Sequence, residues 1–398
     1  KFIRIDMEKI FLFSAGFLFF IYGGYGILLW AVNRLFKNGQ LSETTDEELP
    51  HVAIVIAAYN EEPIIESKIK NTLALNYPAD KLHIYLVSDG STDKTNEIAT
   101  RFKEVTILWS YLRRGKTAAI NRAMKLISEP VTVFTDSNVM LNSGALINMV
   151  VHYADPYVGG VSGEKQVVDS ADANASSTEG LYWKYESFLK HEDAKLSTLV
   201  GAAGELFSVR TTLFEPIPDD TLLDDFIISM NIIRKGFRIA YEPTAYAREL
   251  PSVNLNEEFK RKVRISAGGL QSVFRLPDLL NIFRYGVFTF QYLFHRVSRW
   301  ILSPLLIVLA FISNAFIAFD SLQYLVLFEF QICFHICALA GWYCETKGIK
   351  IKALFVPFYF NFMHVCIVAG WFRYFSGKQD VRWQKAERLL GTEQLKNI

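Results

Sequence analysis

Three stretches of the chain, at residues 10–33, 300–319 and 353–372, contain no charged side chain. Each is about as long as the roughly 20 apolar residues that a helix needs to cross a bilayer. A fourth apolar stretch, residues 321–344, carries a single charge, Glu329. The sequence therefore predicts a multi-pass membrane protein with four crossings, one before and three after a long polar segment.

The composition agrees with a membrane protein that also contains a folded polar part. Of the 398 residues, 51% are hydrophobic and 21% are charged, which is more apolar than an ordinary soluble domain. The 42 basic and 41 acidic side chains leave a formal charge of +1, so nothing electrostatic favours a nucleic-acid partner. This composition excludes a purely cytosolic enzyme, a secreted disulfide scaffold and a disordered chain.

The long polar segment alternates between predicted strands and predicted helices. Residues 51–59, 82–88, 105–109 and 131–134 form nearly continuous apolar runs, and the segments between them carry helical spacing. Such strands are typical of a parallel sheet that helices cover on both faces. The predicted fold class is therefore α/β, with a Rossmann-like nucleotide-binding domain followed by an α-helical transmembrane domain.

These patterns divide the chain into five predicted parts. They are an N-terminal transmembrane helix (1–41), the α/β domain (42–275), interface helices (276–296), three transmembrane helices (297–375) and a C-terminal tail (376–398). Residues 276–295 combine aromatic and aliphatic side chains with sparse charges, which suits a helix in the membrane interface. An ordinary amphipathic helix on the domain core is the alternative.

Polar side chains follow the first two predicted strands. Ala58, Tyr59 and Glu61 come at the end of the first strand, and Asp89 comes at the end of the second. Ligands bind to such sheets at the carboxyl ends of the strands. A carboxylate there accepts hydrogen bonds from a base or a ribose, although Asp89 by itself could equally cap the following helix.

Two further segments favour a bound diphosphate and a divalent cation. Lys116 opens a predicted helix, and a helix N-terminus with a lysine suits a diphosphate contact. Asp136 and Asn138 follow the fourth strand, and alternate residues of an extended segment face the same way. One acid and one amide suffice for Mg²⁺ or Mn²⁺ when phosphate and water complete the shell. An Asx turn is the alternative.

Charged pairs mark the end of the polar segment. Asp224 and Asp225 begin a predicted helix, where they either complement the helix dipole or act as a general base near a bound sugar. Arg261 and Arg264 lie three residues apart, so one helical face presents both guanidinium groups to phosphates. A solvated basic stripe at the membrane surface is the alternative for these arginines.

The order of these motifs resembles the membrane-embedded family 2 glycosyltransferases, in the branch that contains cellulose, hyaluronan, chitin-oligosaccharide and poly-N-acetylglucosamine synthases. The resemblance implies a GT-A catalytic domain, hexosyltransferase activity and a Mg²⁺ or Mn²⁺ cofactor. On the donor side, the resemblance implies one set of residues that binds the UDP and one pair, from the segment that follows the fourth strand, that binds the metal. The nucleotide set is Ala58, Tyr59, Glu61, Asp89, Lys116, Asp136, Arg261 and Arg264, and the metal pair is Asp136 with Asn138.

On the acceptor side, the resemblance implies that Asp225 is the catalytic base and that Asp224 stands beside it. Trp183, Gly204 and Glu205 would lie near the acceptor, although core packing is an equal alternative for Trp183 and its neighbours Tyr185 and Glu186.

Three departures from the family motifs matter. Asn138 replaces the second aspartate of Asp-x-Asp, and Leu223 with Asp224 replaces Thr-Glu. Ile265 replaces the tryptophan of Gln-x-x-Arg-Trp, which weakens the case for processive synthesis. A second Arg-x-x-Arg-Trp match, residues 296–300, adjoins an apolar stretch and is interpreted as a helix-end anchor at headgroup level.

The expected function is inverting transfer of a GlcNAc- or glucose-like sugar from UDP to a growing glycan or a lipid-linked acceptor. A polyprenyl-phosphate glycosyltransferase is the alternative enzyme, and a membrane transporter or scaffold with a degenerate nucleotide domain is the non-catalytic one. Expected partners are the donor, the acceptor, the bilayer and an accessory export protein. The expected location is the inner (plasma) membrane with a cytoplasmic catalytic domain, although the basic tail conflicts with this topology under the positive-inside rule.

Overall fold

The computed structural model describes residues 2–35, 49–167, 176–250, 254–349 and 351–377, and the chain divides into two compact units. The sheet unit comprises described residues within 38–170 and 193–257. The helical unit comprises described residues within 1–37, 171–192 and 258–378. Most of the predicted C-terminal tail, from residue 378 onward, lies outside the described residues.

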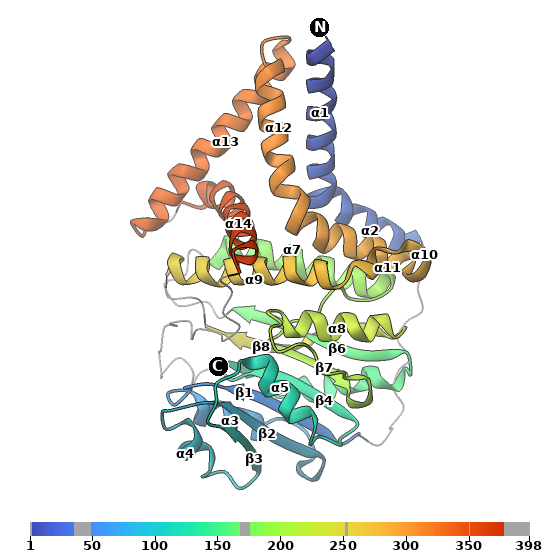
Figure 1. The fold of residues 1–398 in the computed structure, drawn as a ribbon, viewed down its shortest axis with the longest axis vertical. Helices are drawn as coiled ribbons and strands as arrows, with labels where there is room; N and C mark the ends of the chain where they lie inside the picture. Colours follow the sequence, from blue (N-terminus) through green and yellow to red (C-terminus); the bar gives the residue numbers. More distant parts are fainter. Residues whose placement is uncertain (1, 36–48, 168–175, 251–253, 350, 378–398) are drawn as a thin grey trace. The chain divides into compact units, whose positions relative to one another are not determined.

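The sheet unit contains eight strands in the described part of the chain, in the order β3-β2-β1-β4-β7-β6-β8-β5 (Figure 1). Neighbours β3, β2, β1 and β4 are parallel and correspond to the four predicted strands, which are thereby confirmed. The bounds are β1 Val52–Ala58, β2 Leu82–Asp89, β3 Val105–Ser110, β4 Val131–Asp136, β5 Val139–Leu141, β6 Val158–Val167, β7 Leu206–Arg210 and β8 Arg238–Glu249.

The second half of the sheet, strands β5 to β8, was not predicted from the sequence patterns. Strand β7 is antiparallel to both β4 and β6, and β5 is antiparallel to β8, so the sheet is mixed. The reason lies in the sequences of these strands. Strand β5 has three residues, and β6 and β8 interrupt their apolar residues with glycine, charge or proline, which removes the continuous apolar pattern.

Helices pack on the sheet and complete its core. All seven residues of β1 are buried, as expected of a central strand covered on both faces. Helix α5 contacts β1 and β2, α3 contacts β5, and α6 and α8 contact β6 and β8. The helices of this unit are α3 Ile65–Leu73, α4 Thr95–Ala99, α5 Lys116–Met124, α6 Ala145–Val150 and α8 Asp224–Arg234.

The helical unit is formed mainly by long apolar helices. Helix α1 packs along α12 (Figure 1), and α13 contacts α14. Helices α7 and α9 belong to this unit over most of their length. The elements are α1 Phe2–Phe19, η1 Phe20–Gly24, α2 Tyr25–Leu35, α7 Ser176–Leu196, α9 Leu255–Arg275, η5 Pro277–Leu280, α10 Ile282–Tyr285, α11 Val287–Tyr292, η6 Leu293–Leu302, α12 Ser303–Ile317, α13 Leu322–Thr346 and α14 Lys352–Phe375.

Four helical spans in the described residues are long and apolar enough to cross a bilayer, and they coincide with the four apolar stretches of the sequence. They are Asp6–Leu35, Val287–Ile317, Leu322–Thr346 and Lys352–Phe375. The chain is therefore a membrane protein. The second span starts at Val287, within the predicted interface segment 276–296, because α11, η6 and α12 form one continuous helical stretch.

A buried ion cluster lies inside the helical unit, where α7 meets η6. Glu186 accepts hydrogen bonds from Arg296 and Arg299 at 3.0 Å each, and His295 lies 3.4 Å away. Glu186 is 5% exposed and Arg299 is 9% exposed. The interpretation of this Arg-x-x-Arg-Trp match as a headgroup anchor is therefore wrong for Arg299. Its carboxylate partner is more than 100 residues away in the sequence.

Candidate functional site

The sheet register brings the ends of three strands to one edge. Ala57 of β1 pairs with Asp136 of β4, and Ala58 pairs with Ser88 of β2, one residue before Asp89. Chain segments that are tens of residues apart thus place their polar side chains at the same carboxyl edge. This is the edge where α/β sheets bind ligands.

The loops that follow β1 and β2 are bound to each other. The backbone N–H of Asn60 donates to Ser91 Oγ at 3.1 Å, and Asn60 Oδ1 accepts from the N–H of Thr92 at 2.8 Å. The N–H of Glu61 donates to Thr95 Oγ1 at 2.8 Å. These hydrogen bonds hold the backbone of Asn60 and of the predicted nucleotide-binding residue Glu61 against the loop after β2.

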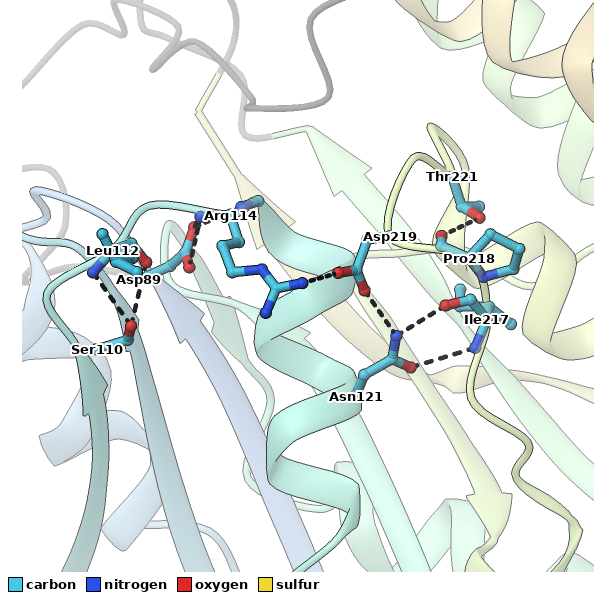
Figure 2. Close-up of polar contacts among 10 residues, drawn as sticks. Asp89, Ser110, Leu112, Arg114, Asn121, Ile217, Pro218, Asp219 and Thr221 are labelled. Carbon is cyan, nitrogen blue, oxygen red and sulfur yellow. Dashed lines mark hydrogen bonds and ion pairs between the residues drawn. The ribbon is translucent and has the colours of Figure 1, made fainter.

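Asp89 is fully buried and holds the loop that precedes α5. Its carboxylate accepts from the N–H of Arg114 at 3.1 Å and from the N–H of Gly115 at 2.6 Å (Figure 2). Gly90 has a φ of +75°, and a Cβ there would lie 2.9 Å from the nitrogen of Arg113. The Arg113 guanidinium in turn lies 3.7 Å from the centroid of the Tyr59 ring. The loop therefore packs tightly onto the ends of β1 and β2.

Arg114 links this loop to the segment before α8. Its guanidinium lies 2.7 Å from Asp219 Oδ2. Figure 2 shows the two side chains pointing toward each other, with Asn121 beside them. Asn121 donates to the carbonyl oxygen of Ile217 at 2.7 Å, and Thr117 Oγ1 donates to that of Thr221 at 3.1 Å. These bonds fasten residues 217–221 to α5, and α8 begins three residues later.

Lys116 is the centre of an ionic cluster at the strand edge. Its Nζ lies 2.8 Å from Asp136 Oδ1 and 3.4 Å from Asp224 Oδ2. Burial by itself would lower the pKa of Lys116, but Asp136, Asp224 and Asp225 raise it above its ordinary value. The lysine is therefore a fixed positive charge among three predicted site residues.

Asp225 lies in the first turn of α8 and carries a shifted pKa. Burial, followed by the neighbouring charge of Asp224, raises the pKa of Asp225 to about 7, although Lys116 acts in the opposite direction. Oδ1 accepts from the N–H of Phe226 at 2.8 Å. A Cβ on Gly204 would lie 2.9 Å from Oδ2, so the glycine leaves this oxygen its space. A carboxylate with such a pKa is well suited to general base catalysis near neutral pH.

A second charged network surrounds Asn138. Its Nδ2 donates to Glu249 Oε1 at 3.4 Å, and Glu249 forms an ion pair with the buried Lys165. Lys165 also pairs with Glu205, a predicted acceptor-binding residue. An aspartate at position 138 would place its carboxylate beside that of Glu249, whereas the asparagine amide donates to it. This contact explains why asparagine is compatible with this position.

The strand edge fits a cation that is shared with a ligand. In the described residues, no group of three or more His, Cys, Asp and Glu side chains is arranged to hold a metal ion. Asp136 and Asn138 offer one carboxylate and one amide oxygen, and the Asp136 side chain is 31% exposed. Mg²⁺ typically takes one or two protein carboxylates and completes its shell with phosphate and water. The donor set therefore suits a metal–diphosphate complex.

Three predicted site residues belong to the helical unit. On α9, Arg261 makes a two-pronged contact with Glu258, at 3.0 and 2.9 Å, and Arg264 lies one turn further along. On α7, the ring of Trp183 lies 5.6 Å from Nζ of Lys262. The convergence of Arg261, Arg264 and Trp183 with the Lys116 cluster stays a prediction.

Sequence reasoning missed three buried charged residues near the predicted site: Lys68, Lys165 and Glu249. For Lys68 a signal exists, because it lies four residues after Ile64 and three after Ile65 and so shares the apolar face of its helix. No pattern marks Lys165 or Glu249, because both lie in strands without regular alternation.

Comparison with known proteins decides the family. The family described as "Glycosyltransferase like family 2" matches residues 50–268, more than half of the chain. The chain belongs to glycosyltransferase family 2. This confirms the resemblance drawn from the sequence motifs, and the matched residues cover every strand of the sheet.

Two curated relatives carry the same name. The chain is 28% identical over 241 residues to the poly-beta-1,6-N-acetyl-D-glucosamine synthase of Staphylococcus aureus (strain COL), covering 58% of this chain and 57% of that protein. It is 21% identical over 247 residues to the enzyme of that name from Staphylococcus epidermidis, covering 60% of each. The chain thus matches little more than half the length of these relatives.

A solved structure supports the fold. The mannosyltransferase PcManGT from Pyrobaculum calidifontis, in complex with GDP-Man and Mn²⁺, superposes with a TM-score of 0.69. The sequences are 20% identical, and the match covers 95% of this chain and 100% of that one. The sheet unit therefore has the GT-A (Rossmann-like) fold predicted for this family 2 chain, accompanied by apolar helices.

Proposed function

We propose that this protein is an inverting membrane glycosyltransferase that moves a GlcNAc- or glucose-like sugar from UDP to a hydroxyl of a growing glycan or a lipid-linked acceptor. The observation that carries the proposal is the cluster of Lys116, Asp136, Asp224 and Asp225 at the carboxyl edge of the sheet. The names of the staphylococcal relatives support N-acetylglucosamine as the transferred sugar.

Asp225 is the proposed catalytic base. Its carboxylate takes the proton of the acceptor hydroxyl while that oxygen attacks the anomeric carbon from the face opposite to UDP. The new glycosidic bond forms as the bond between the anomeric carbon and the diphosphate oxygen breaks, so the configuration inverts. Gly204 leaves room beside Asp225 Oδ2, where the acceptor hydroxyl would approach. Glu205 and Trp183 are proposed to contact the acceptor.

The donor side is proposed to bind the nucleotide and its charge. Asp136 and Asn138 would hold Mg²⁺ or Mn²⁺, which, when bound, neutralises the negative charge that grows on the departing diphosphate. Lys116 adds a positive charge at the same edge, and Arg261 with Arg264 is proposed to contact the phosphates. Ala58, Tyr59, Glu61 and Asp89 would form the base and ribose side of the site.

We place the protein in the inner (plasma) membrane as a multi-pass protein with its sheet unit in the cytoplasm, where nucleotide sugars are present. An accessory export protein is a proposed partner if the product leaves the cell.

The test is a transfer assay with the full chain in detergent, Mn²⁺ and radiolabelled UDP-GlcNAc, UDP-glucose or GDP-mannose. We expect label from UDP-GlcNAc in a glycan product. Asp225→Asn should abolish transfer yet retain UDP binding. Asp80→Asn is the matched control, because Asp80 is exposed at the opposite, amino-terminal end of β2 and should leave the rate unchanged.

The other outcomes separate the alternatives. A labelled product that extracts into organic solvent and depends on added polyprenyl phosphate would identify a lipid-linked sugar instead of a glycan. Transfer from GDP-mannose alone would overturn the proposed donor. Full turnover by Asp225→Asn would remove Asp225 from the role of base.

A further inference from the structure

Lys68, a residue of α3, is fully buried behind the turn that carries Asp136 and Asn138. We infer that Lys68 is a positioning residue, which holds this turn in the conformation that presents Asp136 and Asn138 to a divalent cation. The inference rests on the proposed function, because it assigns the cation of the nucleotide-sugar complex to this turn.

A single side chain secures both ends of the turn. Lys68 Nζ donates to Thr135 Oγ1 and to the carbonyl oxygen of Val139, each at 2.9 Å. Thr135 and Val139 flank residues 136–138, which are the last residue of β4 and the two-residue connection to β5. Movement of Asp136 or Asn138 relative to the sheet would therefore strain or break a hydrogen bond to the lysine.

Thr135 extends this support to the acceptor side of the predicted site. The same hydroxyl that accepts from Lys68 donates to the carbonyl oxygen of Glu205 at 2.9 Å. Glu205 follows Gly204, which approaches Asp225. Lys68 is thus connected by two successive hydrogen bonds to the segment beside the proposed base.

Helix α3 also contacts the short strand β5. One edge of β5 pairs with β8. On its other side, Asn71 Nδ2 donates to the carbonyl oxygen of Leu141 at 2.9 Å, and Asn71 Oδ1 accepts from the N–H of Leu141 at 2.8 Å. Lys68 and Asn71 are three residues apart and share one face of α3. The lysine therefore holds the turn, and the asparagine holds the far end of β5.

The burial of Lys68 needs a compensating role. An ammonium group removed from water is strongly destabilising unless hydrogen bonds and opposite charge offset the loss. Two hydrogen bonds and the attraction of Asp136 provide that compensation. Burial nevertheless lowers the pKa of Lys68 to about 7. An apolar side chain would fill the helix face without that cost, so packing alone does not account for the lysine.

The experiment compares Lys68→Met with two matched variants of the full chain. Methionine keeps an apolar stem and removes the ammonium group. In the presence of UDP, we expect the Kd for Mn²⁺, measured by electron paramagnetic resonance titration, to rise roughly tenfold, as for residues that orient metal ligands. The Mn²⁺ concentration for half-maximal transfer should rise in parallel, and saturating Mn²⁺ should restore part of the rate.

Lys70→Met and Asn71→Leu are the controls. Lys70 is exposed on the same helix and pairs with Glu66, so its loss should leave the Mn²⁺ Kd unchanged. Asn71→Leu loosens β5 without touching the turn. An equal rise in Kd in Asn71→Leu would show general loosening and would overturn the inference, as would an unchanged Kd in Lys68→Met.

If Lys68→Met does not fold, Thr135→Val removes the hydroxyl that accepts from Lys68 and should raise the Mn²⁺ Kd in the same direction; an unchanged Kd there overturns the inference. If the wild type binds Mn²⁺ with UDP but transfers no sugar, the proposed function fails, while the binding titration still decides the role of Lys68. A wild type that binds no Mn²⁺ with UDP overturns the inference directly.

Discussion

At the scale of single residues, neighbouring charges shift the pKa values of Lys116 and Asp225 at the sheet edge in ways that give the two groups different roles. Burial acts against the charged form of both Lys116 and Asp225. Lys116 keeps its charge because three carboxylates surround it. Asp225 has Asp224 beside it, so its pKa rises to about 7. Groups whose environments push their pKa values apart are typical of acid–base sites.

This difference predicts an acidic limit for transfer. The proposed base works only as a carboxylate, so the transfer rate at fixed saturating Mn²⁺ should fall about tenfold per pH unit below the pKa of about 7. Asp224→Asn removes a charge that raises the pKa of Asp225, so this pKa should fall. The rate of any residual transfer should then begin to decline only at a lower pH than in the wild type. Initial transfer rates of the wild type and of Asp224→Asn between roughly pH 5 and 9 check the two expectations. An acidic limit that does not move in Asp224→Asn would contradict the assignment.

The same shift has a consequence for stability. The pKa of Asp225 in the folded state lies above its ordinary value of 3.8, so the fold binds this proton more tightly than the unfolded chain. The contribution of protonated Asp225 to the free energy of unfolding is fully present below about pH 4 and is lost as the pH rises toward about 7. Above pH 7, Asp225→Asn should therefore stabilise the sheet unit by about 1 to 3 kcal/mol. Thermal unfolding that shows a loss at that pH would contradict this sign.

At the scale of elements, close helix packing organises the helical unit. Gly370 of α14 faces α9 so closely that a Cβ would lie 2.6 Å from Ser266 Cβ and 2.9 Å from the backbone nitrogen of Ala267. Helix α9 carries Arg261 and Arg264. The distance between these two helices therefore depends on the absence of a side chain at position 370.

Gly370→Ala should destabilise the protein by about 1 to 3 kcal/mol, because the added methyl group meets backbone atoms that cannot move independently. Gly16→Ala is the matched control, since no atom lies within 4 Å of a Cβ at that exposed position of α1. There alanine should be neutral or stabilising by up to roughly 1 kcal/mol through its helix propensity. Thermal unfolding in detergent measures both. Equal effects of the two substitutions would contradict the packing argument.

Elements also show which parts of the fold a sequence pattern can predict. The apolar runs that predicted β1 to β4 are continuous because each strand is covered on both faces. Strands β6 and β8 contain Lys165 and Glu249, two buried charges that compensate each other across the sheet. A charge that is stabilised by a distant partner looks like a surface residue in the sequence, so these strands could not be predicted.

At the scale of the whole molecule, the sheet unit carries the proposed chemistry and the helical unit carries the spans. The proposed topology places the sheet unit in the cytoplasm and the loop between α12 and α13 on the opposite side. Both places offer an exposed residue for labelling, Lys103 in the sheet unit and Asp320 in the loop.

Single cysteines at these two positions should therefore react from opposite sides. In a chain whose four native cysteines are replaced by alanine, Lys103→Cys should react with an impermeant maleimide only in inside-out vesicles. Asp320→Cys should react only in right-side-out vesicles. Labelling of both positions from one side would contradict the proposal that α12 crosses the bilayer, and the reverse pattern would contradict the orientation.

The sequence alone determined the membrane class, the first four strands and the order of the family motifs. These features depend on local patterns, because a spanning helix or a doubly covered strand needs an unbroken apolar run wherever it occurs. The motif residues at 89, 116, 136 and 225 were likewise identified by their positions at strand ends and helix starts.

Only the tertiary structure decided which charges are paired and what each one supports. It joined Lys116 to Asp136 and Asp224, enclosed Asp89 among backbone N–H groups, and buried Lys68 behind the turn that carries Asp136. The physical reason is that a buried charge is stable only with partners, and here those partners come from segments far apart in the chain.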